Sequence, residues 1–598
     1  MASSYIRPDH GLADGKWPLW LVATAFIILI GLRVTDVFAG VIPGADDMMR
    51  LQQIRDLLGG QGWFDVAQSR MLTPEGGDMH WSRLPDLFVA GVILLTEPVL
   101  GRETAEHLAI GIWPLILLTG AFTFLHVVME RLQVNRAGQV FGFICFATSA
   151  AVFNFWPGRI DHHGLVVVLT LAGFAAVLSP GLSARSAVLL ALCVTAILSI
   201  ALEGLPYIAG LIAILGLFWI VRGHREGVRL TSFGVSLMAF ATGFYVLDAP
   251  GFGSQRMVCD AYGTSHWFGL VLGGGLLVLL GVFGGALDTW LKRLIAGGIA
   301  GALTLTAIVA VNPACLGDPY ATVSDAVRLS WLNTVGEAKT FSTLWTEEPD
   351  RIVWVFGFLL VGSVSVGAML RTADKEQRTA RIGFALLLVL SIFTTVWQIR
   401  GQSFSHVFAA IGAGWLAGVL FANWRTQGGA KPLLLFALAA VVASPVFWER
   451  LSASFALPVD DNAPVSQNLS CVKPQAYEGM VADDTLRIHT PIILSVSVLA
   501  RTPHEVFAGP YHRNIRGIER SIEVFIDPPE LAHSRLLEMG ATHLLYCKGL
   551  RETNRYADTW PNGLAALLNR DDVPAWLEPV DGHTETEGAV RLYRIRSN

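Results

Sequence analysis

Charged residues are scarce in this chain. Only 15% of its 598 residues are Asp, Glu, Lys or Arg, while 53% are hydrophobic; a soluble globular protein carries about 25% charged residues. The deficit falls in residues 1–450, whereas residues 451–598 have the composition of an ordinary soluble domain. We therefore expect an α-helical polytopic membrane domain over residues 1–450 and a soluble α/β domain over residues 451–598.

A basic excess is also missing, because acidic residues outnumber basic ones and the net charge is −5. Nucleic-acid binding needs a basic patch or stripe, so we expect no nucleic-acid partner. Six cysteines without a CxxC pair exclude a disulfide scaffold and show no zinc spacing. Neither a P-loop nor a G-x-G-x-x-G element precedes a helix, so the chain shows no nucleotide-binding motif.

Long apolar runs fill the first 450 residues. A helix needs about 20 mostly apolar residues to cross a bilayer, and the first run lacks the cleavage pattern of a secretory signal. We therefore expect a retained first span and thirteen spans in all. They are residues 18–40, 107–128, 137–156, 164–180, 184–201, 205–222, 229–247, 268–287, 294–311, 352–370, 381–398, 402–421 and 432–448.

Loop charge predicts the direction of these spans. The apolar run Leu87–Gly101 contains Glu97 and Pro98, and it is short enough to be re-entrant or interfacial. If it does not cross, every basic loop falls on the cytoplasmic side, in agreement with the positive-inside rule; if it crosses, most of them fall outside. We therefore expect a multi-pass inner (cytoplasmic) membrane protein with a cytoplasmic N-terminus and a periplasmic C-terminal domain.

The first outer loop begins with an acidic pair. Asp46 and Asp47 stand just after the first span, and carboxylates are the hard oxygen ligands that divalent cations prefer. The alternative is a solvated turn after Pro43. Arg50 follows on a predicted helix; arginine suits phosphate binding, although Arg50 has the alternative of pairing with Asp46 or Asp56.

The second outer loop is short and polar. Between two apolar spans it carries Arg159, Asp161, His162 and His163. Ionisable groups at such depth are costly and indicate function, and both Asp and His are metal ligands. The alternative is a helix capped by Asp161 beside two interfacial histidines.

Two further outer elements carry charge. Thr334-Val335-Gly336-Glu337 lies in the middle of the loop 312–351. Such a T-x-x-E is typical of a capping box. Arg400 stands at the mouth of a span, where it is suited either to hold a phosphate or to anchor the helix end.

The C-terminal domain shows an α/β pattern. Ile492–Ala500 and His543–Cys547 are predicted strands, and Pro529–Gly540 is a predicted helix. The polar run Gly509–Asn514 is suited to contact a substrate, with a structural role as the alternative.

Four of the six cysteines lie on the predicted outer side, where disulfides form. A Cys471–Cys547 bridge is favoured over a Cys259–Cys315 bridge. Cys145 and Cys193 lie within spans, so we expect buried thiols there.

In order and predicted side, these elements resemble the catalytic subunit of the oligosaccharyltransferases, within the membrane-embedded GT-C glycosyltransferases. That family has thirteen spans, an early acidic residue in the first outer loop, a short acidic motif in the second, and a later Thr/Ser-Ile/Val-x-Glu. This chain has Asp46-Asp47, then Asp161-His162-His163 in a form similar to archaeal members, then Thr334–Glu337. Trp63–Gly76 also resembles the family's first loop, and the similarity covers residues 20–450.

The resemblance implies a glycosyltransferase that moves a sugar or oligosaccharide from a polyprenyl-phosphate or pyrophosphate lipid to a glycan, lipid or protein acceptor on the periplasmic side. It implies a divalent cation, Mg²⁺ or Mn²⁺, as cofactor. The implied catalytic residues are Asp47, Asp161 and Glu337; the implied metal ligands are Asp47 (with Asp46 as the alternative), Asp161 and His163; and the implied substrate-binding residues are Arg50, Arg159, Arg400 and His162.

One element of the family is missing. Residues 449–598 contain no Trp-Trp-Asp-Tyr-Gly motif, so the resemblance does not extend to recognition of an asparagine sequon. Two other functions compete with glycosyl transfer: a transporter or flippase for lipid-linked glycans, and a non-catalytic envelope-glycan assembly protein. Transporters tend to show internal repeats and polar groups at the midplane, and we see neither here.

Overall fold

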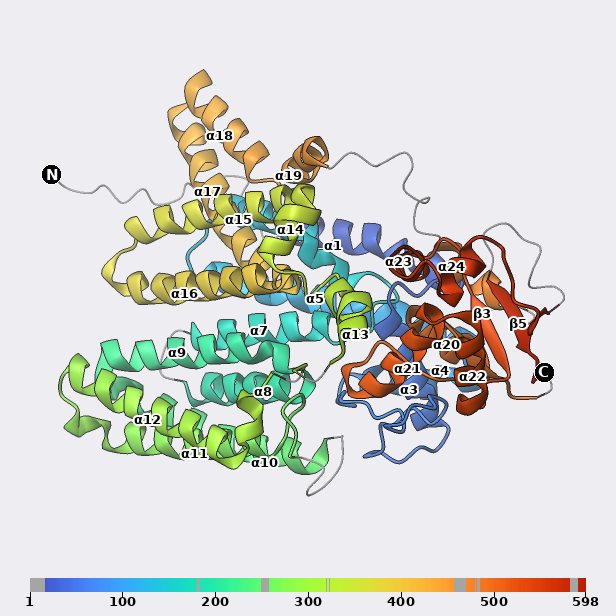
Figure 1. Ribbon diagram of the computed structural model, residues 1–598. Helices are drawn as coiled ribbons and strands as arrows, with labels where there is room; N and C mark the ends of the chain where they lie inside the picture. Colours follow the sequence, from blue (N-terminus) through green and yellow to red (C-terminus); the bar gives the residue numbers. More distant parts are fainter. Residues whose placement is uncertain are drawn as a thin grey trace.

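The computed structural model describes residues 17–179, 183–248, 257–318, 320–321, 323–456, 469–478, 480, 484–580 and 590–597. Its described part is mostly helical (Figure 1). Long helices lie side by side in one half of the molecule, and a small sheet flanked by short helices lies at one end of them.

All thirteen predicted spans coincide with helical segments. These are α1 (Trp17–Gly31) with α2 (Val34–Phe38), α5 (Arg102–Arg131), α6 (Arg136–Ala147), α7 (His163–Val177), α8 (Ala184–Ile200), α9 (Leu205–Arg222), α10 (Gly227–Leu247), α11 (Thr264–Phe283), α12 (Trp290–Val311), α15 (Pro349–Arg371), α16 (Lys375–Trp397), α17 (Gln402–Gln427), and α18 (Ala430–Val442) with α19 (Pro445–Ser452).

The chain is a polytopic membrane protein. Among the described residues, eight helical stretches are long and apolar enough to cross a membrane, or nine if the pair α18–α19, bent by 62°, counts as one span. One of the eight stretches contains both α9 and α10, and α6, α7 and α8 are shorter apolar helices. The number of thirteen spans, the cytoplasmic N-terminus and the periplasmic side therefore stay predictions.

The run Leu87–Gly101 forms α4 (Asp86–Leu100), a helix of 15 residues that packs against α5. Gly101 joins the two helices with a φ of 77°, a conformation that glycine adopts without strain. With 15 residues, α4 is shorter than the 18 residues required of a candidate membrane span among the described helices. Its length and its place beside α5 agree with the interfacial interpretation.

Glycines bring α6 and α17 into close contact. A Cβ added at Gly414 would lie 2.5 Å from the carbonyl oxygen of Gly138, and one at Gly418 would lie 2.6 Å from the Gly138 backbone nitrogen. Small residues of this kind let membrane helices approach backbone to backbone. This contact fixes α17, whose first turn carries part of the site described below.

The C-terminal region holds a five-stranded sheet of order β2-β1-β3-β5-β4. Strand β1 pairs in parallel with β2 and β3, and β5 pairs antiparallel with β3 and β4. The strands are β1 (Arg487–His489), β2 (Glu505–Val506), β3 (His543–Tyr546), β4 (Leu577–Pro579) and β5 (Arg591–Ile595); the helices are α20 (Ile492–Arg501), α21 (Ile515–Ile526), α22 (Pro529–Met539), α23 (Arg551–Thr559) and α24 (Leu564–Asn569).

The predicted strand at His543–Cys547 and the predicted helix at Pro529–Gly540 are confirmed. The predicted strand at Ile492–Ala500 is wrong, because this segment is helix α20. Parallel strands need a crossover connection, and α20 is that connection between β1 and β2. It is buried along most of its length, and its Ile and Val residues are of the β-branched type that favours strands in a sequence.

The first outer loop is built into the C-terminal sheet. The backbone N–H of Leu72 donates to the carbonyl of Val506 at 2.7 Å, and the N–H of Val506 donates to the carbonyl of Arg70 at 2.9 Å. Met71 packs in the same buried cluster as Ile488 and Val506. The loop therefore extends the edge of the sheet at β2 and shares its core.

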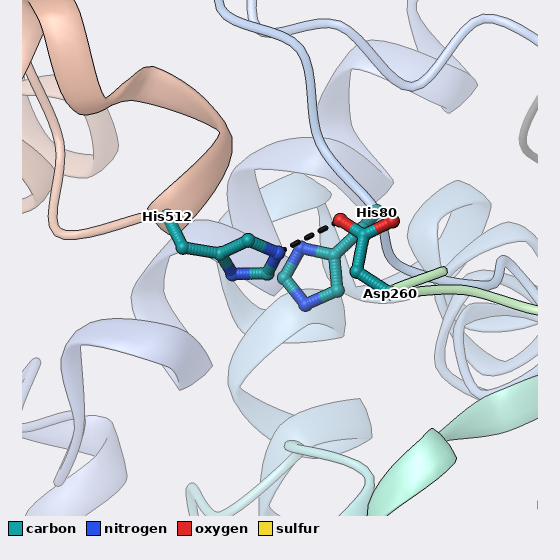
Figure 2. Close-up of side chains that lie close together, drawn as sticks. All are labelled: His80, Asp260 and His512. Atoms are coloured by element: carbon teal, nitrogen blue, oxygen red, sulfur yellow. Dashed lines mark hydrogen bonds and ion pairs between the residues drawn. The ribbon is translucent and has the colours of Figure 1, made fainter. Parts of the chain in front are cut away.

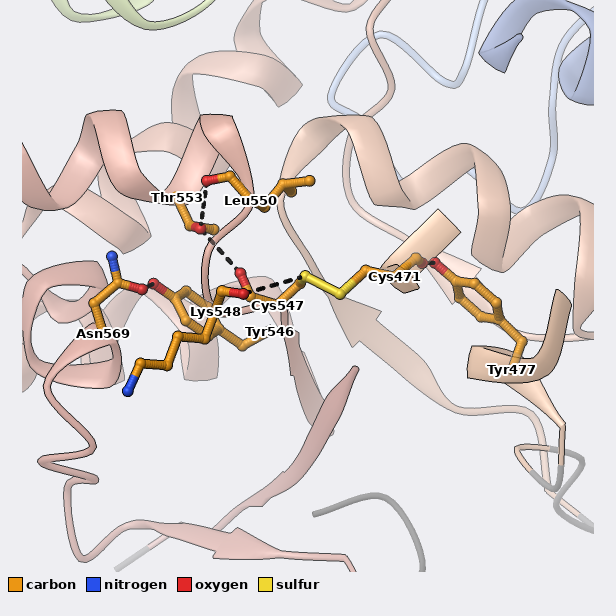
Figure 3. The surroundings of a disulfide bond; sticks show 8 residues. All are labelled: Cys471, Tyr477, Tyr546, Cys547, Lys548, Leu550, Thr553 and Asn569. Carbon is orange, nitrogen blue, oxygen red and sulfur yellow. Dashed lines mark hydrogen bonds between the residues drawn. A yellow bond between two sulfur atoms is a disulfide. The ribbon is translucent and has the colours of Figure 1, made fainter. Parts of the chain in front are cut away.

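Both candidate disulfides are formed. Cys471 and Cys547 join the segment before β1 to the end of β3, as Figure 3 shows. Cys259 and Cys315, which we considered the weaker pair, are bonded as well. Cys145 and Cys193 are free and buried, as expected.

Candidate active site

The polar site lies at the end of the helices that faces the C-terminal region. Four short turns between helices meet there: the start of α3 (Ala45–Leu58), the loop 156–162 before α7, the turn η2 (Leu202–Gly204) between α8 and α9, and the turn η8 (Ile399–Gly401) between α16 and α17. The loop before α14 (Phe341–Glu347) adds Glu337.

Asp47 holds the second outer loop in place. Its Oδ2 accepts a hydrogen bond from Arg159 at 2.7 Å, and its Oδ1 accepts the backbone N–H groups of Ile160 and Asp161, both at 2.8 Å. The side chain is fully buried. A Cβ at Gly44 would lie 2.6 Å from both the Asp47 carboxylate and the Arg159 guanidinium, so a larger residue there would displace this pair. Both charged groups are thus committed to each other.

Asp46 is the free carboxylate of the acidic pair. Within the described part of the chain it makes no hydrogen bond or ion pair. Burial, and then repulsion from Asp161 and Glu337, raise the pKa of Asp46 to about 7. The resemblance favoured Asp47 as the metal ligand, whereas this geometry favours Asp46.

Two carboxylates hold the two histidines of the second loop. Asp161 contacts His162 Nδ1 at 2.6 Å and His163 Nε2 at 3.1 Å. Glu203, from η2, contacts His163 Nδ1 at 2.6 Å and His162 Nε2 at 3.3 Å. Burial alone would raise the pKa of Asp161, but the two imidazoles outweigh it and the pKa lies well below its usual range.

Glu337 and Arg400 complete the cluster. Glu337 lies 3.9 Å from His163 Nε2 and 3.4 Å from Arg400 Nη2, and Arg400 Nη1 lies 3.4 Å from Glu203. The backbone N–H of Arg400 also donates to the Glu337 carbonyl at 3.0 Å. No capping box forms here, because the Thr334 hydroxyl donates to the Trp331 carbonyl instead.

Arg50 is the predicted site residue that lies in an internal contact. Its guanidinium donates to Asp86 at 2.6 Å and to the Ser82 carbonyl at 3.3 Å, and it lies over the Trp81 ring. The side chain is only 1% exposed. Its partner is thus neither Asp46 nor Asp56, and the contact joins α3 to α4.

Glu203 is the site residue that the sequence analysis missed. It lies in the three-residue turn Leu-Glu-Gly between two apolar helices. Like Asp161, Glu203 is an ionisable group between two apolar helices, a placement that is costly and indicates function. A charge in so short a turn between apolar helices was the available signal.

A cavity of about 630 Å³ adjoins the cluster. Its polar lining includes Glu203 and Arg400 at one side and Asp260 and His512 at another. Its aromatic lining includes Tyr207, Tyr320, Trp397 and Phe404. Tyr207 stacks on Phe404 with ring centroids 3.8 Å apart, so the first turns of α9 and α17 form an apolar wall.

The donor set of the cluster fits a divalent cation. One ligand atom each from Asp161, His162 and His163 lie within 4.8 Å of one another, and Asp46 adds a free oxygen close enough to be repelled by Asp161. Carboxylates suit Mg²⁺ and Mn²⁺, and imidazole suits later transition metals. Two carboxylates with two imidazoles therefore favour Mn²⁺ over Mg²⁺.

Comparison with known proteins places the fold. No protein-family model matches the chain, and no curated protein sequence matches it. Among solved structures, the archaeal oligosaccharyltransferase AglB from Archaeoglobus fulgidus, in complex with an inhibitory peptide and a dolichol-phosphate, superposes with a TM-score of 0.65 and 13% identity, over 97% of this chain and 74% of the other. The same protein with Zn and sulfate gives 0.61 and 13%, over 94% and 71%.

The chain therefore has a membrane-embedded fold of the GT-C type. More narrowly, it is the fold of the archaeal oligosaccharyltransferase, as the order of the sequence motifs predicted. A third structure, with a tethered acceptor peptide that contains the NVT sequon, gives a TM-score of 0.61 at 11% identity over 95% of this chain and 73% of the other. At these identities the likeness is one of fold.

Metal binding to this cluster is expected to strengthen as the pH rises from 6 to 8. The raised pKa of about 7 means that Asp46 keeps its proton below neutral pH, and a cation must displace that proton to reach the oxygen. Calorimetry with Mn²⁺ in two buffers of different ionisation enthalpy counts the protons released. At pH 7, Asp46→Asn should lower the number of protons released per bound ion by roughly one half. Affinity that does not change between pH 6 and 8 would contradict this assignment.

Proposed function

We propose that this protein is a glycosyltransferase that moves a sugar or oligosaccharide from a polyprenyl-phosphate or pyrophosphate lipid to an acceptor on the periplasmic side of the inner membrane. The observation that carries the proposal is the convergence of Asp46, Asp161, Glu337 and Arg400 beside an apolar-walled cavity. A transporter of lipid-linked glycans is less well supported, because these groups gather at one end of the helices.

The cavity suits an isoprenoid phosphate. Arg400 lies at its polar side, with contacts of 3.4 Å to both Glu203 and Glu337. Its Nε has no hydrogen-bond partner among the described residues. These long contacts leave the guanidinium able to bind phosphate, for which its planar fork is suited. The stacked rings of Tyr207 and Phe404 offer an apolar surface for the first isoprene units.

The reaction needs little from the protein besides position and charge. The bond between the anomeric carbon and the phosphate oxygen breaks, and the electron pair leaves with the lipid phosphate, where Arg400 stabilises the developing charge. The acceptor nucleophile bonds to the anomeric carbon and its proton passes to a carboxylate, for which Asp46 is poised by its raised pKa. A bound divalent cation would supply further charge stabilisation at the leaving oxygen.

The structures that share the fold support a lipid-linked donor. One of them contains a dolichol-phosphate and an inhibitory peptide, and another a tethered acceptor peptide. A dolichol-phosphate is a polyprenyl-type phosphate, so the same class of lipid is the natural donor here. The acceptor is a glycan, a lipid or a protein, because the chain lacks the Trp-Trp-Asp-Tyr-Gly motif.

The decisive experiment is lipid analysis of a deletion strain. A polyprenyl-linked glycan should accumulate in the deletion strain and disappear on complementation with the wild-type gene. Purified protein should consume that isolated lipid when Mn²⁺ is present and stop when a chelator is added. A deletion strain with an unchanged pool of lipid-linked glycans, together with no consumption in vitro, would overturn the proposal.

Arg400→Ala is expected to raise the KM for the lipid donor by about 10–100-fold, the value of a lost charge-assisted hydrogen bond or two. Arg400→Lys should restore part of this loss, because the charge returns without the planar fork. Steady-state kinetics with the isolated donor measures the effect. Arg425→Ala is the matched control, since Arg425 lies exposed in the last turn of α17, the helix that follows Arg400. Equal KM values for the two alanine variants would contradict the phosphate role.

A further inference from the structure

We propose that His80, Asp260 and His512 form a second cation site, one that takes a single Zn²⁺-type ion. Figure 2 shows the three side chains turned toward one another. His512 Nε2 lies 2.7 Å from Asp260 Oδ2, and the His80 and His512 rings have centroids 4.4 Å apart. One ligand atom from each residue lies within 4.8 Å of the other two.

The three ligands come from three distant parts of the chain. His80 belongs to the first outer loop, Asp260 precedes α11 next to the disulfide-bonded Cys259, and His512 begins the turn η12 (His512–Asn514) before α21. A bound ion would therefore tie the C-terminal region both to the first loop and to the helical part of the molecule. These residues form a group separate from Asp161, His162 and His163, so the proposal does not rest on glycosyl transfer.

A ligand nitrogen is left over at this place. His80 Nδ1 is buried and makes no hydrogen bond with any described residue. A buried polar atom without a partner costs free energy comparable to a lost hydrogen bond, and a coordinated ion removes that cost. This nitrogen distinguishes the cluster from an ordinary His512–Asp260 ion pair, which would not need His80.

Arg513 orients the carboxylate of Asp260. Its Nε and Nη2 donate to the two oxygens of Asp260 at 2.7 and 2.9 Å, and its Nη1 donates to Asp78 at 3.0 Å and to the Met79 carbonyl at 2.9 Å. Metal-bound carboxylates are generally held by such outer hydrogen bonds. Asp78 and Asp260 together also outweigh the single positive charge of Arg513, which leaves the cluster attractive to a dication.

Two imidazoles and one carboxylate are the ligands of a zinc site with an open fourth position. Zn²⁺ bonds of about 2.0–2.2 Å place tetrahedral ligand atoms roughly 3.3–3.5 Å apart. The His512–Asp260 contact therefore has to widen by about 0.6 Å. Asp260 and His512 also line the cavity that Glu203 and Arg400 line from another side, so the fourth position opens toward that cavity.

Zinc stoichiometry tests the proposal. The full-length protein in detergent is stripped with a chelator, loaded with Zn²⁺, separated from free ion and measured by mass spectrometry of the metal. His80→Phe and His512→Gln should each bind one equivalent fewer than the wild type. His533→Gln is the matched control. His533 lies in α22 and stacks on Trp576, apart from the cluster, so this variant should keep the wild-type value. Equal stoichiometry in all four proteins would overturn the proposal.

A spectroscopic measurement keeps the proposal testable if a cluster variant fails to fold. The triple variant Asp161→Asn, His162→Gln and His163→Gln removes all three ligands of the other cluster, so this variant is loaded with one equivalent of Zn²⁺ and examined by X-ray absorption. Two imidazoles and one carboxylate around the ion would support the site. A first shell without a pair of imidazoles would overturn it.

Discussion

Asp46→Asn is expected to reduce sugar transfer by about 10²–10³-fold without unfolding the protein, the size of effect seen when one preorganised charge is removed from an active site. The carboxylate has no partner among the described residues, so its replacement by a neutral amide breaks no contact. Burial and the neighbouring carboxylates raise its pKa, because they disfavour the charged form. Turnover of the isolated lipid donor and thermal unfolding are measured together.

Asp47→Asn is the informative comparison. Asp47 pairs with the Arg159 guanidinium and accepts two backbone N–H groups, and breaking a buried ion pair costs about 3–5 kcal/mol. This variant should therefore lose activity and stability together. Asp56→Asn is the control on the same helix, where Asp56 accepts from Gln52 and Gln68. If Asp47→Asn melted like the wild type while Asp46→Asn melted early, the two assignments would be reversed.

Replacing both Cys471 and Cys547 by alanine is expected to destabilise the C-terminal region by about 4 kcal/mol. The bridge joins residues 76 positions apart. A cross-link over that length lowers the entropy of the unfolded chain, which raises its free energy by about 4 kcal/mol. Both sulfurs lie in fully buried residues. Chemical denaturation, detected by the protease sensitivity of the C-terminal region, gives the free energy of unfolding and therefore the change.

The control for that experiment is Cys193→Ala. Cys193 is buried in α8 and is free, so its replacement tests the loss of a buried sulfur without the loss of a cross-link. It should cost about 1 kcal/mol. A double variant as stable as the control would show that the region does not depend on its bridge.

The membrane helices and the order of the polar motifs could be predicted because each leaves a local signal. A run of apolar residues predicts a membrane helix. Asp161 and Arg400 stand out because each lies between two such runs. These residues converge because consecutive helices run in opposite directions. Every second turn between helices therefore lies at the same end of the helical domain. Glu203 carried the same signal in its three-residue turn.

The choice between Asp46 and Asp47 could not be predicted from the sequence. Neighbouring residues on a helix point about 100° apart, so the rotation of α3 about its axis decides which of them faces the cluster. That rotation is set by contacts such as the Arg50–Asp86 pair, which joins residues 36 positions apart. The strand predicted at Ile492–Ala500 failed for a related reason, because β-branched residues favour strands only until tertiary burial decides otherwise.

The edge contact between residues 70–72 and β2 also delays folding during biosynthesis, because the two partners are made at different times. Arg70 donates to a carbonyl 432 residues further along the chain. At about 5–20 residues per second, the ribosome needs roughly 20–90 s to make that partner. During this interval Met71 and the open hydrogen-bonding edge beside it stay uncovered, so newly made chains expose an edge that is prone to pair with other chains. A nonsense mutation before residue 500 would leave that edge permanently uncovered.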